Sequence, residues 1–298
     1  MLRNHLPTDT PIDLVATLGP LLRGRGDPTM QLSAGRVLRA TRTEDGPATV
    51  EITADASGFA VCAWGPGAER GAEEVPALLG MDDNADLFRP RHGLIAELAR
   101  RRRGLRIGRT GRVIEALVPA ILEQKVTGEE ARRGFRGLVH RYGEPAPGPY
   151  RLFVQPSPDR LAGLPYHAFH PFGVERRRAE VVRRAATVAA RLEEGVGLPI
   201  EQAYGRLQAV AGIGRWTAAE VGIRAFGDAD AVSVGDFHLP NLVAWALAGE
   251  PRGTDERMLE LLEPYRGQRG RVIRLLESSG IRPPRYGPRL APRAIAGI

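Results

Sequence analysis

The sequence predicts a mostly α-helical protein with a small α+β domain at its N-terminus, and two residue patterns lead to this fold class. Apolar and polar residues alternate over 49–55 (TVEITAD), and a short apolar run follows over 59–64 (FAVCAW), as in half-buried strands. From about residue 84 onward, apolar residues recur instead at helical spacing. We therefore expect a sheet-containing domain over 1–83, helical domains over 84–280 and an irregular tail over 281–298.

Apolar stripes at helical spacing predict the individual helices. One helix is expected near 12–22 in the N-terminal domain. The others are expected near 113–122, 135–142, 175–193, 200–209, 216–226, 240–248, 254–263 and 267–278. The segment 143–172 is rich in Pro and Gly (GEPAPGP, QPSP, LPYHAFHPFG), so we expect it to be mostly loop.

Composition and charge limit the class of protein. The 298 residues, 43% of them apolar and 26% charged, suit one or two globular cores. No run approaches the roughly 18 apolar residues of a membrane helix, and MLRNHLPTDT lacks the apolar core of a signal peptide. A net charge of +7 favours a polyanionic partner, although arginine-rich usage, typical of GC-rich genomes, explains part of it. We expect a cytoplasmic protein.

Cysteine and histidine usage bears on metals. Cys62 is the only cysteine, which excludes a disulfide or a multi-cysteine cluster within one chain. The six His residues show no zinc-type spacing. The sequence therefore predicts no metal and no other cofactor.

A run of seven arginines lies over 100–112 (RRRRGLRIGRTGR), just before the helix that leads to Gln124 and Lys125. Such a run is often only a solvated surface. In a protein that binds nucleic acid it would instead contact phosphates without reading bases. The sequence leaves both interpretations open.

The stretch over 207–239 (LQAVAGIGRWTAAEVGIRAFGDADAVSVGDFHL) predicts a helix, a tight turn and a second helix. The turn contains Gly212 and Gly214 on either side of Ile213. Two such glycines allow a close approach of the backbone and expose successive N–H groups. At the positive end of a helix, this arrangement suits a phosphate oxygen. An ordinary helical hairpin with glycines for packing is the alternative.

The pattern LxxxxGIGxWTA, followed by an aspartate in VGDFH, resembles the helix-hairpin-helix (HhH-GPD) DNA glycosylase superfamily. GIGRWTA is most similar to its alkylbase branch, the 3-methyladenine DNA glycosylase II family. The resemblance extends over about 85–278 in helix order and, more loosely, to a small N-terminal sheet domain. It implies HhH-GPD helical domains and a monomeric bacterial repair enzyme, associated with the nucleoid through double-stranded DNA that carries a damaged base.

The family's essential aspartate falls on Asp236, which the resemblance therefore identifies as catalytic. Breaking a purine N-glycosidic bond builds positive charge on the deoxyribose. A fixed carboxylate stabilises this charge and can orient or deprotonate the attacking water. Asp236 would also suit an N-cap before Leu239 and Pro240, and both roles can hold at once.

Three functions are compatible with this resemblance. The first is a monofunctional glycosylase that releases a damaged base, expected to be an alkylated purine. The second is a non-catalytic protein that binds distorted or abasic DNA, which would not need Asp236. The third is a glycosylase/lyase, which needs an amine to form a Schiff base. In lyase-competent relatives that lysine follows the turn by two residues, and Trp216 holds this position here.

Enzymes that act on a base extrude it into a pocket, so contacts to DNA and to the base are both required. The resemblance assigns DNA contacts to Gly212, Ile213, Gly214, Arg215 and Thr217 in and after the turn. It assigns the base pocket to Trp216, Glu220, His238 and Arg274.

The pocket residues allow more than one interpretation. Trp216 would stack on an alkylated base or fill the core between the hairpin helices. His238 would contact the DNA backbone or be structural. Glu220 and Arg274 stand where the family has aromatic residues, so these opposite charges either pair with each other or hydrogen-bond a different base.

Lys125 is the only lysine among the 42 Lys and Arg residues. In the alkylbase family the corresponding turn supplies the side chain inserted where the flipped base had been. Lys125 takes this wedge position with Gln124 beside it, and its long stem would fill the gap while the ammonium reaches a phosphate. The alternative is an ordinary surface lysine at a helix start.

Overall fold

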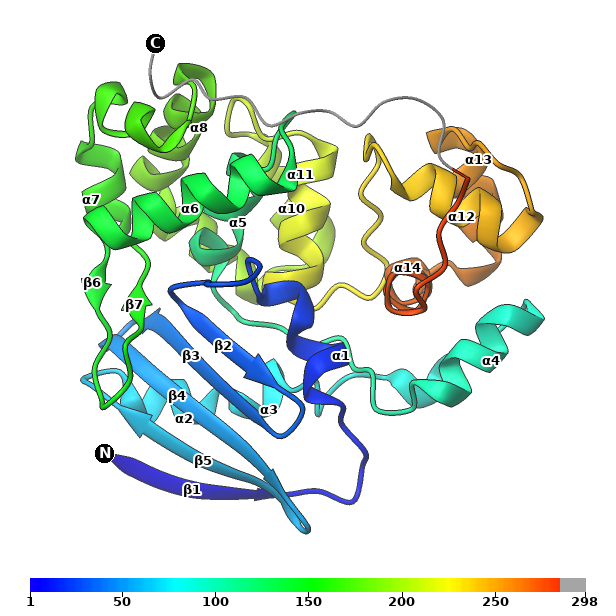
Figure 1. Ribbon diagram of the computed structural model, residues 1–298, viewed down its shortest axis with the longest axis horizontal. Coiled ribbons are helices and arrows are strands. Elements are labelled where there is room, and N and C mark those ends of the chain that lie inside the picture. The colour runs from blue at the N-terminus through cyan, green and yellow to red at the C-terminus, as the bar shows by residue number, and fades with distance from the viewer. Residues whose placement is uncertain (285–298) are drawn as a thin grey trace.

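Residues 1–284, described here in a computed structural model, fold around three large apolar cores. One core lies under a sheet, and the other two belong to two groups of helices (Figure 1). The irregular tail predicted for 281–298 lies, from residue 285 onward, outside the described residues. The predicted division into domains at residue 83 stays a prediction.

The N-terminal part forms a five-stranded antiparallel sheet in the order β1-β5-β4-β3-β2. Its strands are β1 (Leu2–Pro7), β2 (Met30–Ser33), β3 (Arg36–Thr43), β4 (Gly46–Asp55) and β5 (Gly58–Trp64). The strands predicted over 49–55 and 59–64 are confirmed as β4 and β5. Both lie inside the sheet, where Val50, Ile52 and Val61 turn their side chains into the core.

The helices predicted from residue 113 onward are all present. The elements outside the five-stranded sheet are α1 (Leu14–Leu18), η1 (Gly19–Leu21), α2 (Ala68–Glu73), α3 (Val75–Leu78), η2 (Ala85–Leu87), α4 (Gly93–Arg101), α5 (Val113–Leu122), α6 (Gly128–Tyr142), β6 (Glu144–Pro145), β7 (Phe153–Val154), α7 (Pro158–Gly163), η3 (Tyr166–Ala168), η4 (His170–Phe172), α8 (Arg176–Thr187), α9 (Ala189–Glu193), η5 (Glu194–Gly197), α10 (Ile200–Gln208), α11 (Arg215–Val221), the π-helical η6 (Gly222–Phe226), α12 (Leu239–Ala248), α13 (Asp255–Leu262), η7 (Glu263–Tyr265) and α14 (Arg269–Ser278).

Two helical groups flank the segment 227–238, which we name the site loop. One core joins α5, α6, α8, α10 and α11, and another joins α4, α12, α13 and α14. Figure 1 shows the chain crossing from the first group to the second through the site loop. A polar residue on this loop therefore lies between two helical groups that have separate apolar cores.

Two predictions of local structure differ from the fold. The Pro-rich segment 143–172, predicted to be mostly loop, also contains the short β6–β7 hairpin and α7; α7 forms because Pro158 occupies its start and the Ser157 hydroxyl accepts from Arg160 N at 3.2 Å. The helix predicted near 12–22 ends as α1 and continues as η1, since Pro20 has no N–H to extend the α-helical ladder.

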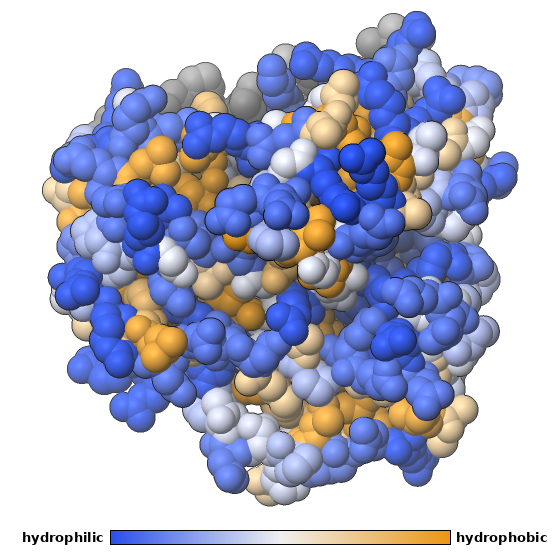
Figure 2. Space-filling view, turned by 180° about the vertical axis from the view of Figure 1, so that it is seen from behind, coloured by the Kyte–Doolittle hydropathy of each residue, from blue (hydrophilic) through white to orange (hydrophobic). Residues whose placement is uncertain are grey.

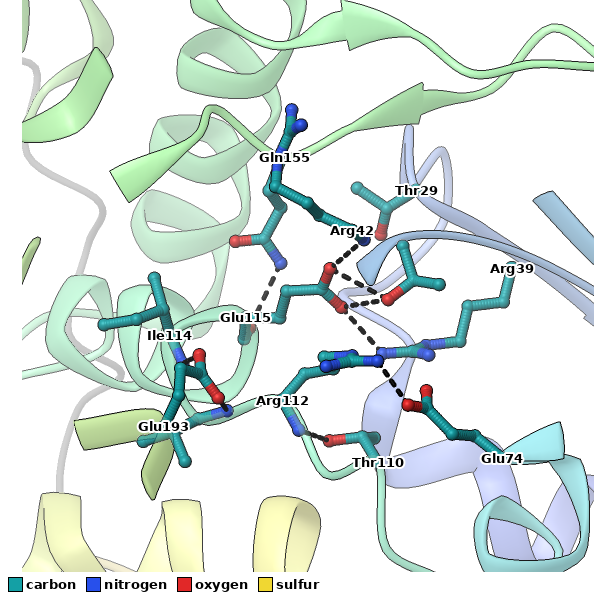
Figure 3. Close-up of polar contacts among 12 residues, drawn as sticks. Thr29, Arg39, Arg42, Glu74, Thr110, Arg112, Ile114, Glu115, Gln155 and Glu193 are labelled. Atoms are coloured by element: carbon teal, nitrogen blue, oxygen red, sulfur yellow. Dashed lines mark hydrogen bonds and ion pairs between the residues drawn. The ribbon is translucent and has the colours of Figure 1, made fainter. Parts of the chain in front are cut away.

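A polar junction joins the sheet to α5 (Figure 3). The Glu115 carboxylate accepts from Arg39 Nη2 at 2.7 Å, from the Thr41 hydroxyl at 2.9 Å and from Arg42 N at 2.7 Å. Only 14% of the Glu115 side chain is exposed. A buried carboxylate with this many donors holds β3 against the start of α5.

The surface is mainly polar. On the face turned away from the view of Figure 1, hydrophilic side chains cover most of the surface and apolar ones form small patches (Figure 2). Within the described residues, none of the helices has the length and apolar character needed to cross a membrane.

Candidate functional site

The helical hairpin consists of α10, a turn and α11. Gly212 has a φ of +99°, and a Cβ there would lie 2.3 Å from Val181 Cγ2, so α8 packs directly on the turn. Buried Ile213 anchors the turn in the core, whereas Gly214 and Arg215 are exposed. No side chain of the described residues caps α11, so its first N–H groups remain free for an external acceptor.

Asp236 lies on the site loop, directly before α12. Its Oδ1 accepts from His238 N at 2.7 Å and from Leu239 N at 2.8 Å. Its Oδ2 accepts from the Trp216 indole N–H at 3.0 Å. The N-cap of α12 is His238 rather than Asp236 as predicted, because the helix begins at Leu239 and Asp236 lies two residues before its cap. The Asp236 carboxylate instead accepts from the cap residue and from the first helical N–H, and the third bond fixes it on α11.

Trp216 is the second residue of α11 and is partly buried. The sequence left open whether its ring fills the core or faces a base. In the structure its N–H edge lies at the Asp236 carboxylate, so the hairpin and the site loop form one polar site.

Phe237 was not predicted as a site residue. It follows Asp236 and is 76% exposed, which makes it the most exposed large apolar residue among those described. Its ring meets His238 edge to face at 4.9 Å between centroids. The only signal in the sequence is an aromatic residue between two polar ones in GDFH, and exposure is visible only after folding.

Glu220 and Arg274, both assigned to the base pocket, do not pair with each other. Glu220 accepts from Arg224 Nη1 at 2.6 Å, one helical turn away, and Arg274 pairs with Glu277. Glu220 also accepts from the Ser233 hydroxyl at 2.5 Å. Burial alone would raise the pKa of Glu220, but Arg224 and Ser233 outweigh it, so the pKa lies below its usual value.

Gln124 connects the turn between α5 and α6 to the hairpin. Its Nε2 donates to Gly212 O at 3.1 Å and to the Thr217 hydroxyl at 2.8 Å. Thr217 is only 2% exposed, so its side chain has no surface to offer DNA, and the predicted DNA contact of this residue stays a prediction for its backbone N–H. Its hydroxyl is turned inward because the first turn of α11 packs against the end of α5.

Lys125 is exposed on this turn. Its φ of +55° makes it the only non-glycine residue with a positive φ among residues 1–284. Side chains rarely adopt this conformation, which costs roughly 1–2 kcal/mol for an ordinary residue. The turn therefore holds Lys125 outward in a strained backbone next to Gln124.

The arginine run over 100–112 is largely engaged within the protein. Arg106 is buried, and four other arginines form ion pairs: Arg101 with Glu97, Arg102 with Asp13, Arg109 with Asp82 and Arg112 with Glu74. These contacts favour the structural interpretation of the run over the phosphate-binding one.

Metal-binding side chains do not gather in the described part of the chain. Among residues 1–284, no group of three or more His, Cys, Asp or Glu side chains is arranged to hold an ion. The polar groups of the site are one carboxylate, backbone N–H groups and the indole N–H.

Comparisons with known proteins bear on the family. No family model matches the chain. The chain is 29% identical over 177 residues to DNA-3-methyladenine glycosylase 2 of Escherichia coli, covering 59% of this chain and 61% of that protein. It is 32% identical over 139 residues to a probable bifunctional transcriptional activator/DNA repair enzyme AlkA of Mycobacterium tuberculosis, covering 46% of this chain and 28% of that protein. The chain thus spans less than two thirds of the length of these curated relatives.

The fold is shared with a solved structure. The solved 3-methyladenine DNA-glycosylase of Archaeoglobus fulgidus superposes with a TM-score of 0.78 at 20% identity, over 93% of this chain and 98% of that one. The GIGRWTA hairpin and an aspartate on the following loop stand within this fold. The chain is thus similar in sequence to DNA-3-methyladenine glycosylase 2 and shares its fold with a solved 3-methyladenine DNA-glycosylase, both of which support the resemblance to the helix-hairpin-helix DNA glycosylase superfamily.

Proposed function

We propose that the protein is a monofunctional DNA glycosylase of base excision repair, which extrudes a damaged base, with alkylated purines as the first candidates, and hydrolyses its N-glycosidic bond. The observation that carries the proposal is the Asp236 carboxylate, held by three N–H donors beside the open hairpin turn. The similarity to DNA-3-methyladenine glycosylase 2 of Escherichia coli supports it.

In this mechanism Asp236 acts on the sugar. The electrons of the glycosidic bond leave with the base, and positive charge develops on the deoxyribose ring. The fixed carboxylate stabilises that charge, orients a water toward the anomeric carbon and accepts its proton. Because the three donors already hold the carboxylate in place, little reorganisation is needed as the charge develops.

DNA is bound around the site. The exposed turn from Gly212 to Arg215 offers N–H groups to a phosphate of the damaged strand. Lys125 enters the space left by the base, supported by the hydrogen bonds of Gln124 to the hairpin. Extrusion costs a few kcal/mol, which an inserted side chain partly offsets.

The base is received by aromatic groups near Asp236. Trp216 and Phe237 are the nearest along the chain, and the exposed Phe237 ring is available to stack on a planar ligand. Both Glu220 oxygens already accept internal hydrogen bonds, so Glu220 is better suited to support the site than to recognise a base.

Lyase chemistry is not part of the proposal. Trp216 occupies the position after the turn from which an amine would attack the sugar. Borohydride should therefore trap no covalent adduct between the protein and abasic DNA. A trapped adduct would revive the lyase and point to Lys125, the only lysine of the chain.

An excision screen tests the proposal. Duplexes with methylated, etheno, deaminated or oxidised bases are incubated with the protein, and free bases are identified by mass spectrometry. We expect release of at least one damaged base, lowered about 10²- to 10⁴-fold by Asp236→Asn. Tight binding of damaged DNA without release from any substrate would show a non-catalytic binding protein instead.

A further inference from the structure

We infer that Ser233 and Glu220 are positioning residues for the reaction, which set the distance and angle at which Asp236 meets the sugar. This inference rests on the proposed function. Neither residue needs to touch DNA in this role, because both act on the site loop that carries Asp236.

Ser233 is hydrogen-bonded at both its side chain and its main chain. Its hydroxyl donates to Glu220 Oε1 at 2.5 Å, and its carbonyl accepts from Asp236 N at 3.2 Å. Ser233 is buried, with 9% of its surface exposed. A shift of the Ser233 hydroxyl would therefore move the backbone of Asp236 through a single turn.

The Glu220 carboxylate that accepts from the Ser233 hydroxyl is itself held rigidly. Its other oxygen accepts from Arg224 Nη1, and Arg224 Nε donates to Pro20 O at 3.1 Å. The side chains of Glu220 and Arg224 are only 16% and 15% exposed. The carboxylate is thus locked between α11 and η1 before it binds Ser233.

The site loop is attached to α11 at two points. Trp216 and Glu220 lie one helical turn apart, and they contact Asp236 and Ser233, respectively. One contact would leave the loop free to rotate about it, whereas two contacts fix the orientation of the carboxylate as well as its position.

The second helical group holds the same loop from the other side. Gly235 N donates to Asp255 Oδ1 at 3.1 Å, and Gly235 has a φ of +93°. The turn between Ser233 and Asp236 is therefore clamped between α11 and α13. The Ser233 hydroxyl is the contact of this clamp that a small substitution can remove while Arg224 still pairs with the Glu220 carboxylate.

Single-turnover base release with Ser233→Ala and Ser233→Thr tests the inference in the full-length protein. For Ser233→Ala we expect the rate at saturating DNA to fall about tenfold, while the dissociation constant for damaged DNA stays within about twofold. Ser233→Thr keeps the hydroxyl and should restore most of the rate. Thr49→Val is the matched control, because the Thr49 hydroxyl is buried in β4 without a hydrogen-bond partner.

Three outcomes would decide against the inference. An unchanged rate in Ser233→Ala would show that the contact does not position Asp236. Parallel losses of rate, DNA affinity and melting temperature, with no rescue by Ser233→Thr, would show a merely structural role. Wild-type protein that releases no base would refute the proposed function itself, which is a separate result from the first two.

Discussion

Glu115 and Asp236 are both hydrogen-bonded carboxylates at a boundary between packed bodies, but their surroundings differ. Glu115 is enclosed at the junction of the sheet with α5, where Arg39 supplies a positive charge and the Thr41 hydroxyl bonds both oxygens. Asp236 is held by neutral N–H groups, and its neighbours Phe237 and His238 are exposed.

The difference separates structural from chemical roles. A carboxylate whose charge is balanced by a buried guanidinium stabilises the fold and has little charge left for a ligand. Neutral donors orient a carboxylate without cancelling its charge, so it can still stabilise a cation that forms beside it. The following predictions test this contrast, beginning with the largest expected effect.

Replacing each carboxylate by its amide should affect different properties. Glu115→Gln removes the ion-pair partner of Arg39, whose side chain is only 12% exposed, and should lower the free energy of unfolding by about 3 kcal/mol. Asp236→Asn should lower it by less than about 1 kcal/mol, because the amide oxygen of Asn still accepts from His238 N and Leu239 N. Urea unfolding of both variants measures this, and equal losses would contradict the contrast.

Gly212→Ala should weaken the hairpin turn. A Cβ at this φ of +99° would lie 2.3 Å from Val181 Cγ2, which should cost about 2 kcal/mol of stability and lower the affinity for DNA. Gly205→Ala on α10 is the control, since a Cβ there meets no atom within 4 Å and helix propensity should improve. Fluorescence anisotropy with a duplex and thermal unfolding compare the two variants.

Lys125→Gly and Lys125→Ala should separate the strain of the turn from the role of the side chain. Both remove the inserted stem, so base release should fall about tenfold in each. Because Lys125 has a φ of +55°, the glycine variant should be more stable than the alanine variant by about 1 kcal/mol. Unchanged release in both would identify Lys125 as an ordinary surface residue.

The smallest effect concerns Asp230, on the same loop as Asp236. Burial would raise its pKa, but hydrogen bonds from Arg269 and Gly267 hold the pKa below its usual value. Ionised Asp230 therefore stabilises the folded protein above the unfolded-state pKa of this carboxyl, and this stabilisation is lost as pH falls through its folded-state pKa. Urea midpoints between about pH 5 and pH 3 should fall less steeply in Asp230→Asn than in wild type; identical slopes would contradict this assignment.

Local patterns were enough to predict much of this protein. Helix order, the strands β4 and β5 and the hairpin turn all follow from residues close together in sequence. Hydrophobic periodicity, glycine positions and capping side chains act over a few residues, so they can be interpreted before the chain folds.

Contacts between distant segments decided the rest. The partner of Glu220, the inward hydroxyl of Thr217 and the exposure of Phe237 depend on how α5, α11 and the site loop meet. The same holds for the arginine run, where Arg112 and Arg109 pair with Glu74 and Asp82. Charge and polarity in a sequence show which groups need a partner, but only tertiary packing determines which partner each group finds and which groups remain open to a ligand.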